Sequence, residues 1–189
     1  MPQMLEKLKE SVSQCRVIAV GDYHYFIHPV TDGIPFMDPE LLREVTDEIL
    51  RIGDFDCDYI ITPEAMGIHL VVPVSLRLGI PYNVIRKRKY DLPGEIDIAQ
   101  CTGYSNTRMF INGLKKGDRI VIIDDVLSTG GTMRAMIGAL RDTIGCRIVD
   151  IIVVFEKTER KTDLEKEFGI RIKSLLKVNI VDDRVVYLD

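Results

Sequence analysis

The sequence predicts an α/β protein in which helices cover both faces of a central parallel sheet, and three observations support this prediction. Short, almost wholly apolar stretches recur at 59–62, 82–85, 119–124 and 147–156. Strands that are apolar on both faces are buried on both faces, as in parallel sheets. Amphipathic segments such as 132–143 lie between these stretches and predict the covering helices. The chain has 189 residues of ordinary globular composition, which suits a single packed domain.

Smaller elements are predicted on either side of this alternation. Apolar residues at helical spacing predict a short helix over 4–14, and the apolar and aromatic stretch 16–30 predicts a hairpin. Asp38 as the N-cap, followed by a proline at the first helical position, predicts the start of a longer amphipathic helix. The tail 162–189 predicts one more helix and two strands.

Composition and charge exclude several classes of protein. The chain carries 25 Lys and Arg against 29 Asp and Glu, and this net charge of −4 excludes a polybasic coat for nucleic acid. No apolar run approaches the roughly 18 residues of a membrane span, and the N-terminus lacks the apolar region of a signal peptide. The four cysteines form no C-x-x-C pair, so a zinc knuckle and a redox motif are excluded. We therefore expect a cytoplasmic protein that binds neither nucleic acid nor membrane.

The segment RIVIIDDVLSTGGTMRAMIGAL, residues 119–140, carries the strongest chemical signal. An apolar strand ends in Asp124 and Asp125 and continues through a turn of small residues into a helix. Paired glycines let the backbone turn several N–H groups toward one point, and the helix N-terminus adds its positive end, so such a turn binds phosphate. Two carboxylates would repel that phosphate unless they face sugar hydroxyls or a hydrated cation. The segment predicts a site for a phosphorylated sugar; a glycine-rich turn with solvated aspartates is the alternative.

Within this segment, IVIIDDVLSTGGT resembles the phosphoribosyl pyrophosphate signature of the type I phosphoribosyltransferases, and the resemblance extends over about residues 30–178. It implies that Asp124 and Asp125, the acid pair, are catalytic and contact the ribose hydroxyls. It implies that Mg²⁺ is bound through the ligand, with Asp125 as the protein's candidate contact. The 5-phosphate would be held by the phosphate loop, which consists of Ser128, Thr129, Gly130, Gly131 and Thr132.

The resemblance also implies the arrangement of the domain. The family has an α/β core with a small hood over the site. We assign the single domain 1–189 a core at about 38–178 and a hood at about 1–37 plus part of the C-terminal tail. The family further implies a homodimer, and the apolar helix predicted at 68–79 would suit its interface.

One segment that the resemblance assigns to pyrophosphate follows the strand at 59–62. In the tract ITPEAMGIHL, the loop 64–67 would line the leaving group through backbone amides of Glu64, Ala65, Met66 and Gly67. Alternatively, Gly67 simply opens a packed helix. Adenine enzymes of the family commonly carry Arg where Met66 stands, and this difference argues against adenine as the substrate.

A second pyrophosphate segment is a basic tract that follows a core strand and consists of Arg86, Lys87, Arg88 and Lys89. It begins a long polar stretch that reaches Thr107, and loops of this length are usually functional lids or disordered. In the family the corresponding loop closes over pyrophosphate, where cations offset developing charge. A solvated basic loop is the alternative. Tyr104 and Ser105 resemble a pair that adenine enzymes follow with a catalytic carboxylate, but Thr107 stands in that place.

The base-binding residues are expected at Lys157 and in the hood. The tract IIVVFEKTE resembles that of xanthine phosphoribosyltransferases, whose Lys contacts purine oxygens. A Lys ammonium donates three hydrogen bonds and accepts none, so Lys157 suits a 6-oxopurine and not adenine. Ile34 and Phe36 stand where related enzymes place apolar groups against the purine. Two alternatives remain open: Lys157 extends to solvent, and Phe36 staples the helix that begins after Asp38.

These residues predict a purine salvage enzyme. It would transfer 5-phosphoribosyl from phosphoribosyl pyrophosphate to N9 of hypoxanthine or guanine, giving IMP or GMP and pyrophosphate. The chain most resembles the archaeal hypoxanthine/guanine phosphoribosyltransferase group, an adenine-type scaffold with an oxopurine site. The alternatives are a xanthine or adenine phosphoribosyltransferase, or a non-catalytic regulator that senses purine or phosphoribosyl pyrophosphate.

Overall fold

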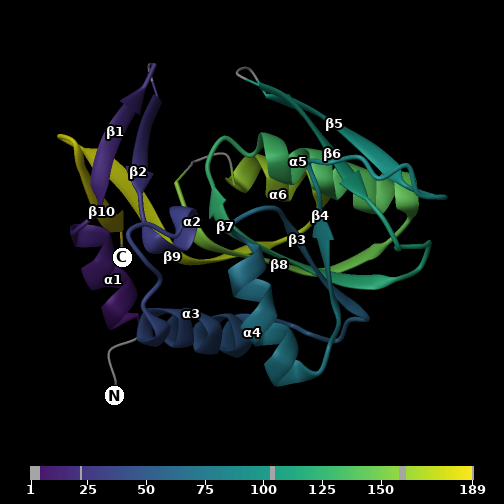
Figure 1. Cartoon of the computed structure of the whole chain (residues 1–189), viewed down its shortest axis with the longest axis horizontal. Coiled ribbons are helices and arrows are strands. Elements are labelled where there is room, and N and C mark those ends of the chain that lie inside the picture. Colours follow the sequence, from purple (N-terminus) through teal and green to yellow (C-terminus); the bar gives the residue numbers. More distant parts are fainter. Residues whose placement is uncertain (1–4, 22, 103–104, 158–160, 189) are drawn as a thin grey trace.

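A six-stranded sheet forms the centre of the molecule in a computed structural model, which describes residues 5–21, 23–102, 105–157 and 161–188 (Figure 1). β9 and β10 pair antiparallel, and every other neighbouring pair in the sheet is parallel. The order across the sheet is β10 (Arg184–Leu188), β9 (Ile172–Val181), β8 (Arg147–Glu156), β7 (Arg119–Leu127), β3 (Tyr59–Pro63) and β4 (Tyr82–Ile85). The predicted parallel α/β architecture is confirmed.

Both faces of the sheet are buried, as the apolar strands predict. In β7, Val121 and Ile123 belong to one hydrophobic core, while Ile120 and Ile122 belong to a second core on the opposite face. All four side chains are fully buried. Each strand residue thus packs against one of two helical layers, because successive side chains of a strand point to opposite faces.

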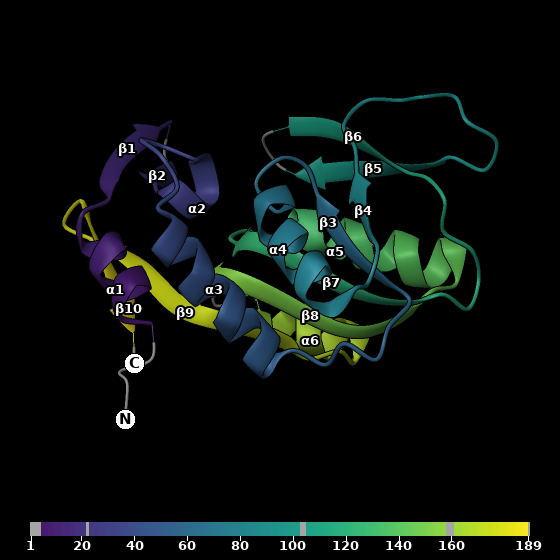
Figure 2. The ribbon, with the colours of Figure 1, turned by 60° about the horizontal axis from the view of Figure 1, so that its bottom comes forward.

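The helices form these two layers (Figure 2). α3 (Pro39–Ile52) and α4 (Ile68–Leu78) cover one face. α5 (Gly131–Ile137), the π-helical segment η1 (Gly138–Ile144) and α6 (Lys161–Phe168) cover the other. The helix predicted at 132–143 is therefore present, but its second half is π-helical. Within the described part of the chain, no helix has the length and apolarity to cross a membrane.

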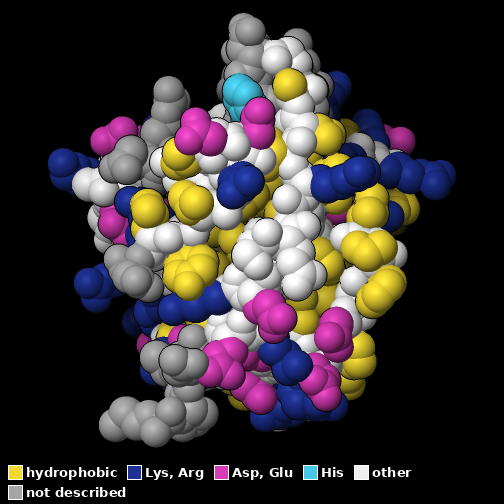
Figure 3. Space-filling view, turned by 90° about the vertical axis from the view of Figure 1, so that its left-hand side faces the viewer, with side chains coloured by type: hydrophobic (Ala, Val, Ile, Leu, Met, Phe, Trp, Pro, Cys, Tyr) yellow, Lys and Arg dark blue, Asp and Glu magenta, His cyan; other side chains and the backbone are white. Residues whose placement is uncertain are grey.

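The N-terminal elements lie at the end of the sheet that carries β9 and β10 (Figures 1 and 2). They are α1 (Glu6–Ser13), the hairpin of β1 (Arg16–Val20) and β2 (Tyr23–Ile27), and α2 (Pro29–Asp32). The outer face of this end mixes hydrophobic side chains with charges of both signs, and acidic side chains lie beside a histidine at its upper rim (Figure 3). As predicted, Asp38 caps α3, with its carboxylate accepting from the Glu40 N–H at 2.8 Å.

The long polar stretch reaching Thr107 is not one loop, which corrects the sequence analysis. It contains an antiparallel hairpin of β5 (Ile96–Thr102) and β6 (Ser105–Ile111). Apolar side chains of the two strands anchor this hairpin to the second core, where Ile98, Met109 and Ile111 are buried. Tyr104 lies outside the described residues, and of Ser105 and Thr107 only the backbone is described.

A buried histidine joins the N-terminal elements to the sheet. Nδ1 of His28 accepts from the Val30 N–H at 3.0 Å, so Nε2 carries the proton and donates to Ser11 Oγ at 2.8 Å. The ring packs edge-on against Phe155 of β8, with 4.9 Å between centroids. Burial lowers the pKa of His28 from 6.5 to about 4.

This pKa predicts a pH dependence of stability. Between pH 6.5 and pH 4 the unfolded chain binds a proton at His28 that the folded chain does not. The contribution is therefore present above pH 6.5 and is lost as the pH falls. We expect the free energy of unfolding to drop by about 2 kcal/mol between about pH 7 and about pH 5. Urea unfolding at the two pH values measures this drop.

His28→Asn is the matched variant for this measurement. Asn caps helices as well as His28 does here, through a side-chain oxygen, but does not titrate. The pH-dependent loss should therefore shrink by most of those 2 kcal/mol in the variant. An equal loss in both proteins would contradict the assignment to His28.

Candidate functional site

Three segments of the predicted site meet at the carboxyl edge of the sheet. β3, β7 and β8 are adjacent parallel strands, so the residues that follow them lie along the same edge. Loop 64–67 follows β3, the phosphate loop follows β7 and Lys157 follows β8. The Lys157 N–H donates to the Leu127 carbonyl at 2.9 Å, which fixes Lys157 beside the start of the phosphate loop.

The acid pair is desolvated. Asp124 is buried with 7% exposure, and one of its carboxylate oxygens accepts from the Asp125 N–H at 2.9 Å. Burial, followed by the charge of Asp125, raises the pKa of Asp124 well above its usual value, and burial also raises the pKa of Asp125. A ligand that brings hydroxyl donors or positive charge would stabilise the ionised pair. The diol of a ribose, or a cation bound with it, has this chemistry.

The phosphate loop is preformed at the start of α5. Ser128 Oγ accepts from the Thr129 N–H at 2.6 Å, and Thr129 Oγ1 accepts from the Gly131 N–H at 3.5 Å. Gly130 has a φ of +79°, and a Cβ there would lie 3.0 Å from the Leu164 side chain of α6. The loop thus needs glycine for its conformation and for its packing.

Loop 64–67 and the basic tract are joined by one carboxylate. Glu64 Oε1 accepts from the Lys87 N–H at 2.5 Å, and Glu64 Oε2 lies 2.9 Å from Arg86 Nε. The Glu64 N–H in turn donates to the Ile85 carbonyl at 2.9 Å. The structure therefore brings together the two segments that the resemblance assigns to pyrophosphate. It also shows the Glu64 side chain positioning the basic tract.

The side chains of Arg88 and Lys89 contact residues of the loop that follows the tract. The Arg88 guanidinium lies 5.6 Å from the centroid of the Tyr90 ring, and Lys89 forms an ion pair with Asp91. Glu95, which the sequence analysis missed, organises this loop. Its carboxylate accepts from the N–H groups of Tyr90 and Asp91 and from the Asn112 amide.

Gly67 is required where loop 64–67 packs on the sheet. A Cβ at this position would lie 1.8 Å from Thr62 Oγ1 and 3.3 Å from the Ile123 carbonyl oxygen. Gly67 is also the N-cap of α4, so the packing interpretation holds, and the pyrophosphate role stays a prediction. Met66 extends to the N-terminal elements, since its Cε lies 3.6 Å from where a Gly33 Cβ would stand.

A second acidic group faces the acid pair from the N-terminal elements. Asp32 accepts from the Tyr25 hydroxyl at 2.6 Å, the Thr31 hydroxyl at 2.6 Å and the His28 N–H at 3.0 Å. Its charge helps to raise the pKa of Asp125, and the charge of Asp125 helps to raise the pKa of Tyr25. Neither Asp32 nor Tyr25 was predicted, because no short motif links β2 to the acid pair.

Ile34 and Phe36 are both exposed to solvent. Their exposed fractions are 56% and 71%. Phe36 therefore does not staple α3, and the neighbouring Met37 packs against the first core instead. The contact of Ile34 and Phe36 with a base stays a prediction.

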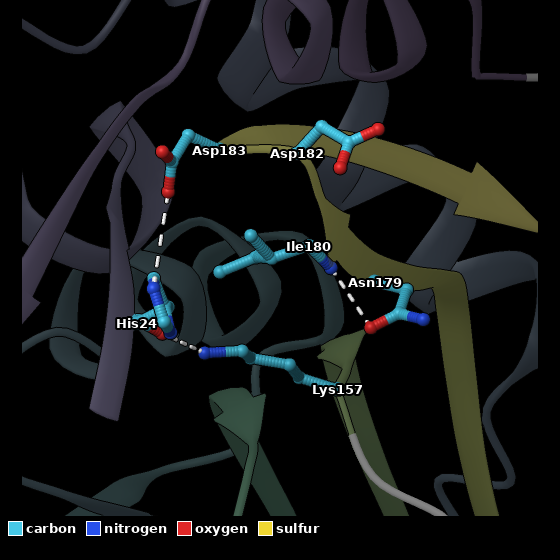
Figure 4. Close-up of a pocket in the computed structure, with 6 residues that line it drawn as sticks. All are labelled: His24, Lys157, Asn179, Ile180, Asp182 and Asp183. Carbon is cyan, nitrogen blue, oxygen red and sulfur yellow. Dashed lines mark hydrogen bonds and ion pairs between the residues drawn. The ribbon is translucent and has the colours of Figure 1, made fainter. Parts of the chain in front are cut away.

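Lys157 points into a cavity of about 400 Å³ (Figure 4). Its ammonium donates to the His24 carbonyl of β2 and lies 5.9 Å from the Phe26 ring centroid, so the side chain does not simply extend to solvent. The remaining lining residues are His24, Asn179, Ile180, Asp182 and Asp183. The cavity thus combines a cation, acids and an apolar side chain, and Lys157 connects it through the Leu127 carbonyl to the strand that precedes the phosphate loop.

Comparison with known proteins defines the class. The model of the phosphoribosyl transferase domain matches residues 40–183, and the chain belongs to this family. Among curated proteins, the hypoxanthine/guanine phosphoribosyltransferase of Methanocaldococcus jannaschii is 51% identical over 96% of this chain and 99% of that protein. The enzyme of the same name from Methanobacterium lacus is 50% identical over 96% of this chain and 95% of that protein.

Solved structures agree on the fold. Adenine phosphoribosyltransferase from Thermoanaerobacter pseudethanolicus superposes with a TM-score of 0.72 at 26% identity, covering 92% of this chain and 99% of that one. The Trypanosoma brucei enzyme in complex with AMP, pyrophosphate and ribose-5-phosphate gives 0.74 at 22% identity, covering 93% and 80%. The scaffold is thus shared with adenine enzymes, while the closer sequence similarity is to hypoxanthine/guanine enzymes.

Proposed function

We propose that this protein is a hypoxanthine/guanine phosphoribosyltransferase of purine salvage. It transfers 5-phosphoribosyl from phosphoribosyl pyrophosphate to N9 of the base and releases pyrophosphate. The observation that carries the proposal is the placement of Lys157 beside the phosphate loop, since its N–H bonds to Leu127 and its ammonium faces a cavity. The curated names of relatives at about 50% identity support the same acceptor. Both substrates are metabolites of the cytoplasm, where we place the enzyme.

The residues divide the work of the reaction. The phosphate loop holds the 5-phosphate, and the acid pair binds the ribose hydroxyls and stabilises positive charge that develops on the sugar ring. Loop 64–67 and the basic tract receive the departing pyrophosphate, where amides and cations offset its charge. Lys157 donates to the oxygen at C6 of the base, with Ile34 and Phe36 as apolar contacts. The hood, about 1–37 plus part of the C-terminal tail, covers the core at about 38–178.

The acid pair fits a Mg²⁺ ion that arrives with the ligand. Carboxylate oxygens are ligands that Mg²⁺ prefers, and Mg²⁺ usually takes one or two of them together with phosphate oxygens and water. Asp125 is the half-buried member of the pair and the one we assign to the ion. The ion would offset the charge of pyrophosphate.

One assay tests the proposed function. Purified protein is mixed with phosphoribosyl pyrophosphate, Mg²⁺ and, separately, hypoxanthine, guanine, xanthine or adenine. We expect IMP and GMP to form, with pyrophosphate released in equal amount, and little product from xanthine or adenine. Binding of a purine without any nucleotide formed would refute the enzyme and favour a sensor. Preferred use of adenine or xanthine would refute the acceptor.

We further propose a homodimer formed through the groove between α3 and α4. Leu76 is 80% exposed there. The groove has a volume of about 290 Å³ and is lined by Pro39, Leu42, Arg43, Thr46, Pro73, Leu76 and Arg77. A second copy would bury this apolar surface.

Leu76→Asp tests the interface. Burying a carboxylate against the apolar surface of a second copy is costly, so we expect the variant to sediment as a 21.5 kDa monomer where the wild type sediments at twice that mass. Leu76→Met, which keeps the apolar contact, should remain dimeric. A dimeric Leu76→Asp protein would place the interface elsewhere.

A further inference from the structure

We propose that Asp183 reads the C2 edge of the purine and makes the enzyme select guanine over xanthine; this inference rests on the proposed function. The cavity of Lys157 is also lined by the turn between β9 and β10, which contains Asp182 and Asp183. Lys157 supplies a donor for the oxygen at C6. Asp183 supplies an acceptor on the opposite side of the same space.

The turn aims one of its two carboxylates at the cavity. Asp182 and Asp183 have φ values of +48° and +57°, as in the two-residue turns that join antiparallel strands. The Asp183 carboxylate points toward His24, whereas the Asp182 carboxylate points away from both His24 and Lys157 (Figure 4). The same turn therefore gives the two acids different surroundings.

His24 links the cation and the acid. Its carbonyl accepts from the Lys157 ammonium, and its ring Nε2 lies 3.8 Å from an oxygen of Asp183. That separation is longer than a hydrogen bond, and the Asp183 side chain is 81% exposed. The carboxylate thus lies beside the His24 ring without a hydrogen bond to it and remains accessible to a ligand. Ile180 lines the same space and offers an apolar surface to a ring.

The pattern of donors and acceptors on guanine matches this arrangement. Guanine presents an oxygen at C6 and, next to it, the N1–H and the amino group at C2, both of which donate. A carboxylate can accept a hydrogen bond from each of these two groups in a bidentate arrangement. Hypoxanthine keeps the N1–H but lacks the amino group. Xanthine has an oxygen at C2 that a carboxylate repels, and adenine has an acceptor at N1.

Asp183→Asn is the test, with kcat/KM measured for guanine, hypoxanthine and xanthine. The Asn amide keeps one acceptor but loses the charge and the second acceptor oxygen, so kcat/KM for guanine should fall about 10-fold to 100-fold. The ratio of guanine to hypoxanthine should fall about 10-fold. The xanthine value should rise, because the Asn amide can donate to the oxygen at C2. The KM for phosphoribosyl pyrophosphate should stay within about twofold.

Two further variants make the result decisive. Asp142→Asn removes the same charge from an exposed, distant position on η1, and its base preference should equal that of the wild type. An equal loss for guanine in Asp182→Asn would show that the net charge of the turn acts, and would overturn the role of Asp183. An unchanged ratio of guanine to hypoxanthine in Asp183→Asn would also overturn the role of Asp183. A wild type that forms neither IMP nor GMP would instead refute the proposed function.

Discussion

Replacing Asp125 by alanine is expected to lower kcat by about 100-fold to 1,000-fold, the range found when one preorganised group that stabilises a transition state is removed. Asp125 is the half-buried carboxylate beside the phosphate loop. The variant would lack the contacts that we propose for this carboxylate with the ribose hydroxyls and with the bound cation. Steady-state formation of IMP at saturating substrates measures the effect.

Stability distinguishes this loss from misfolding. Burial raises the pKa of Asp125, which means that its ionised form is disfavoured in the folded protein. Removing the side chain should therefore leave the melting temperature unchanged or raise it. Asp142→Ala, an exposed acid on η1, serves as the control with normal turnover. Wild-type turnover in Asp125→Ala would remove this carboxylate from the mechanism.

The fold could be predicted because its signals are local. The strands of the sheet are continuous apolar runs, and Val121 and Ile122 pack on opposite faces as such runs imply. Asp38 followed by Pro39 marks the start of α3 within the sequence itself. The β5–β6 hairpin was missed, because its alternation of Ile96 and Ile98 with polar residues is short and weak.

The candidate site likewise contains residues that the sequence predicts and residues that it does not. The acid pair and the phosphate loop are contiguous in sequence, so their proximity follows from one strand and one turn. Asp32 and Asp183 are missing from the prediction because they reach the site from elements distant in sequence. Glu64 was assigned to pyrophosphate through its backbone, but its N–H donates to the Ile85 carbonyl and its side chain holds the basic tract through Arg86. Only the folded chain reveals such contacts.

Lys157→Met is expected to raise the KM for hypoxanthine and guanine by about 10-fold to 100-fold while the KM for phosphoribosyl pyrophosphate stays within about twofold. Met keeps the length and packing of the side chain but offers no donor to the oxygen at C6. The range corresponds to about 1.5–3 kcal/mol for a hydrogen bond from a charged group. Initial rates at varied concentrations of each substrate separate the two constants.

Lys157 also bonds to the His24 carbonyl, so the variant could act through β2 rather than through the base. Lys157→Arg separates these effects, because a guanidinium still donates to both the carbonyl and a purine oxygen. We expect it to recover most of the base affinity that Lys157→Met loses, at an unchanged melting temperature. Equal losses for base and phosphoribosyl pyrophosphate would show that Lys157 organises the whole site. The contact with the oxygen at C6 would then have to come from another residue of the cavity.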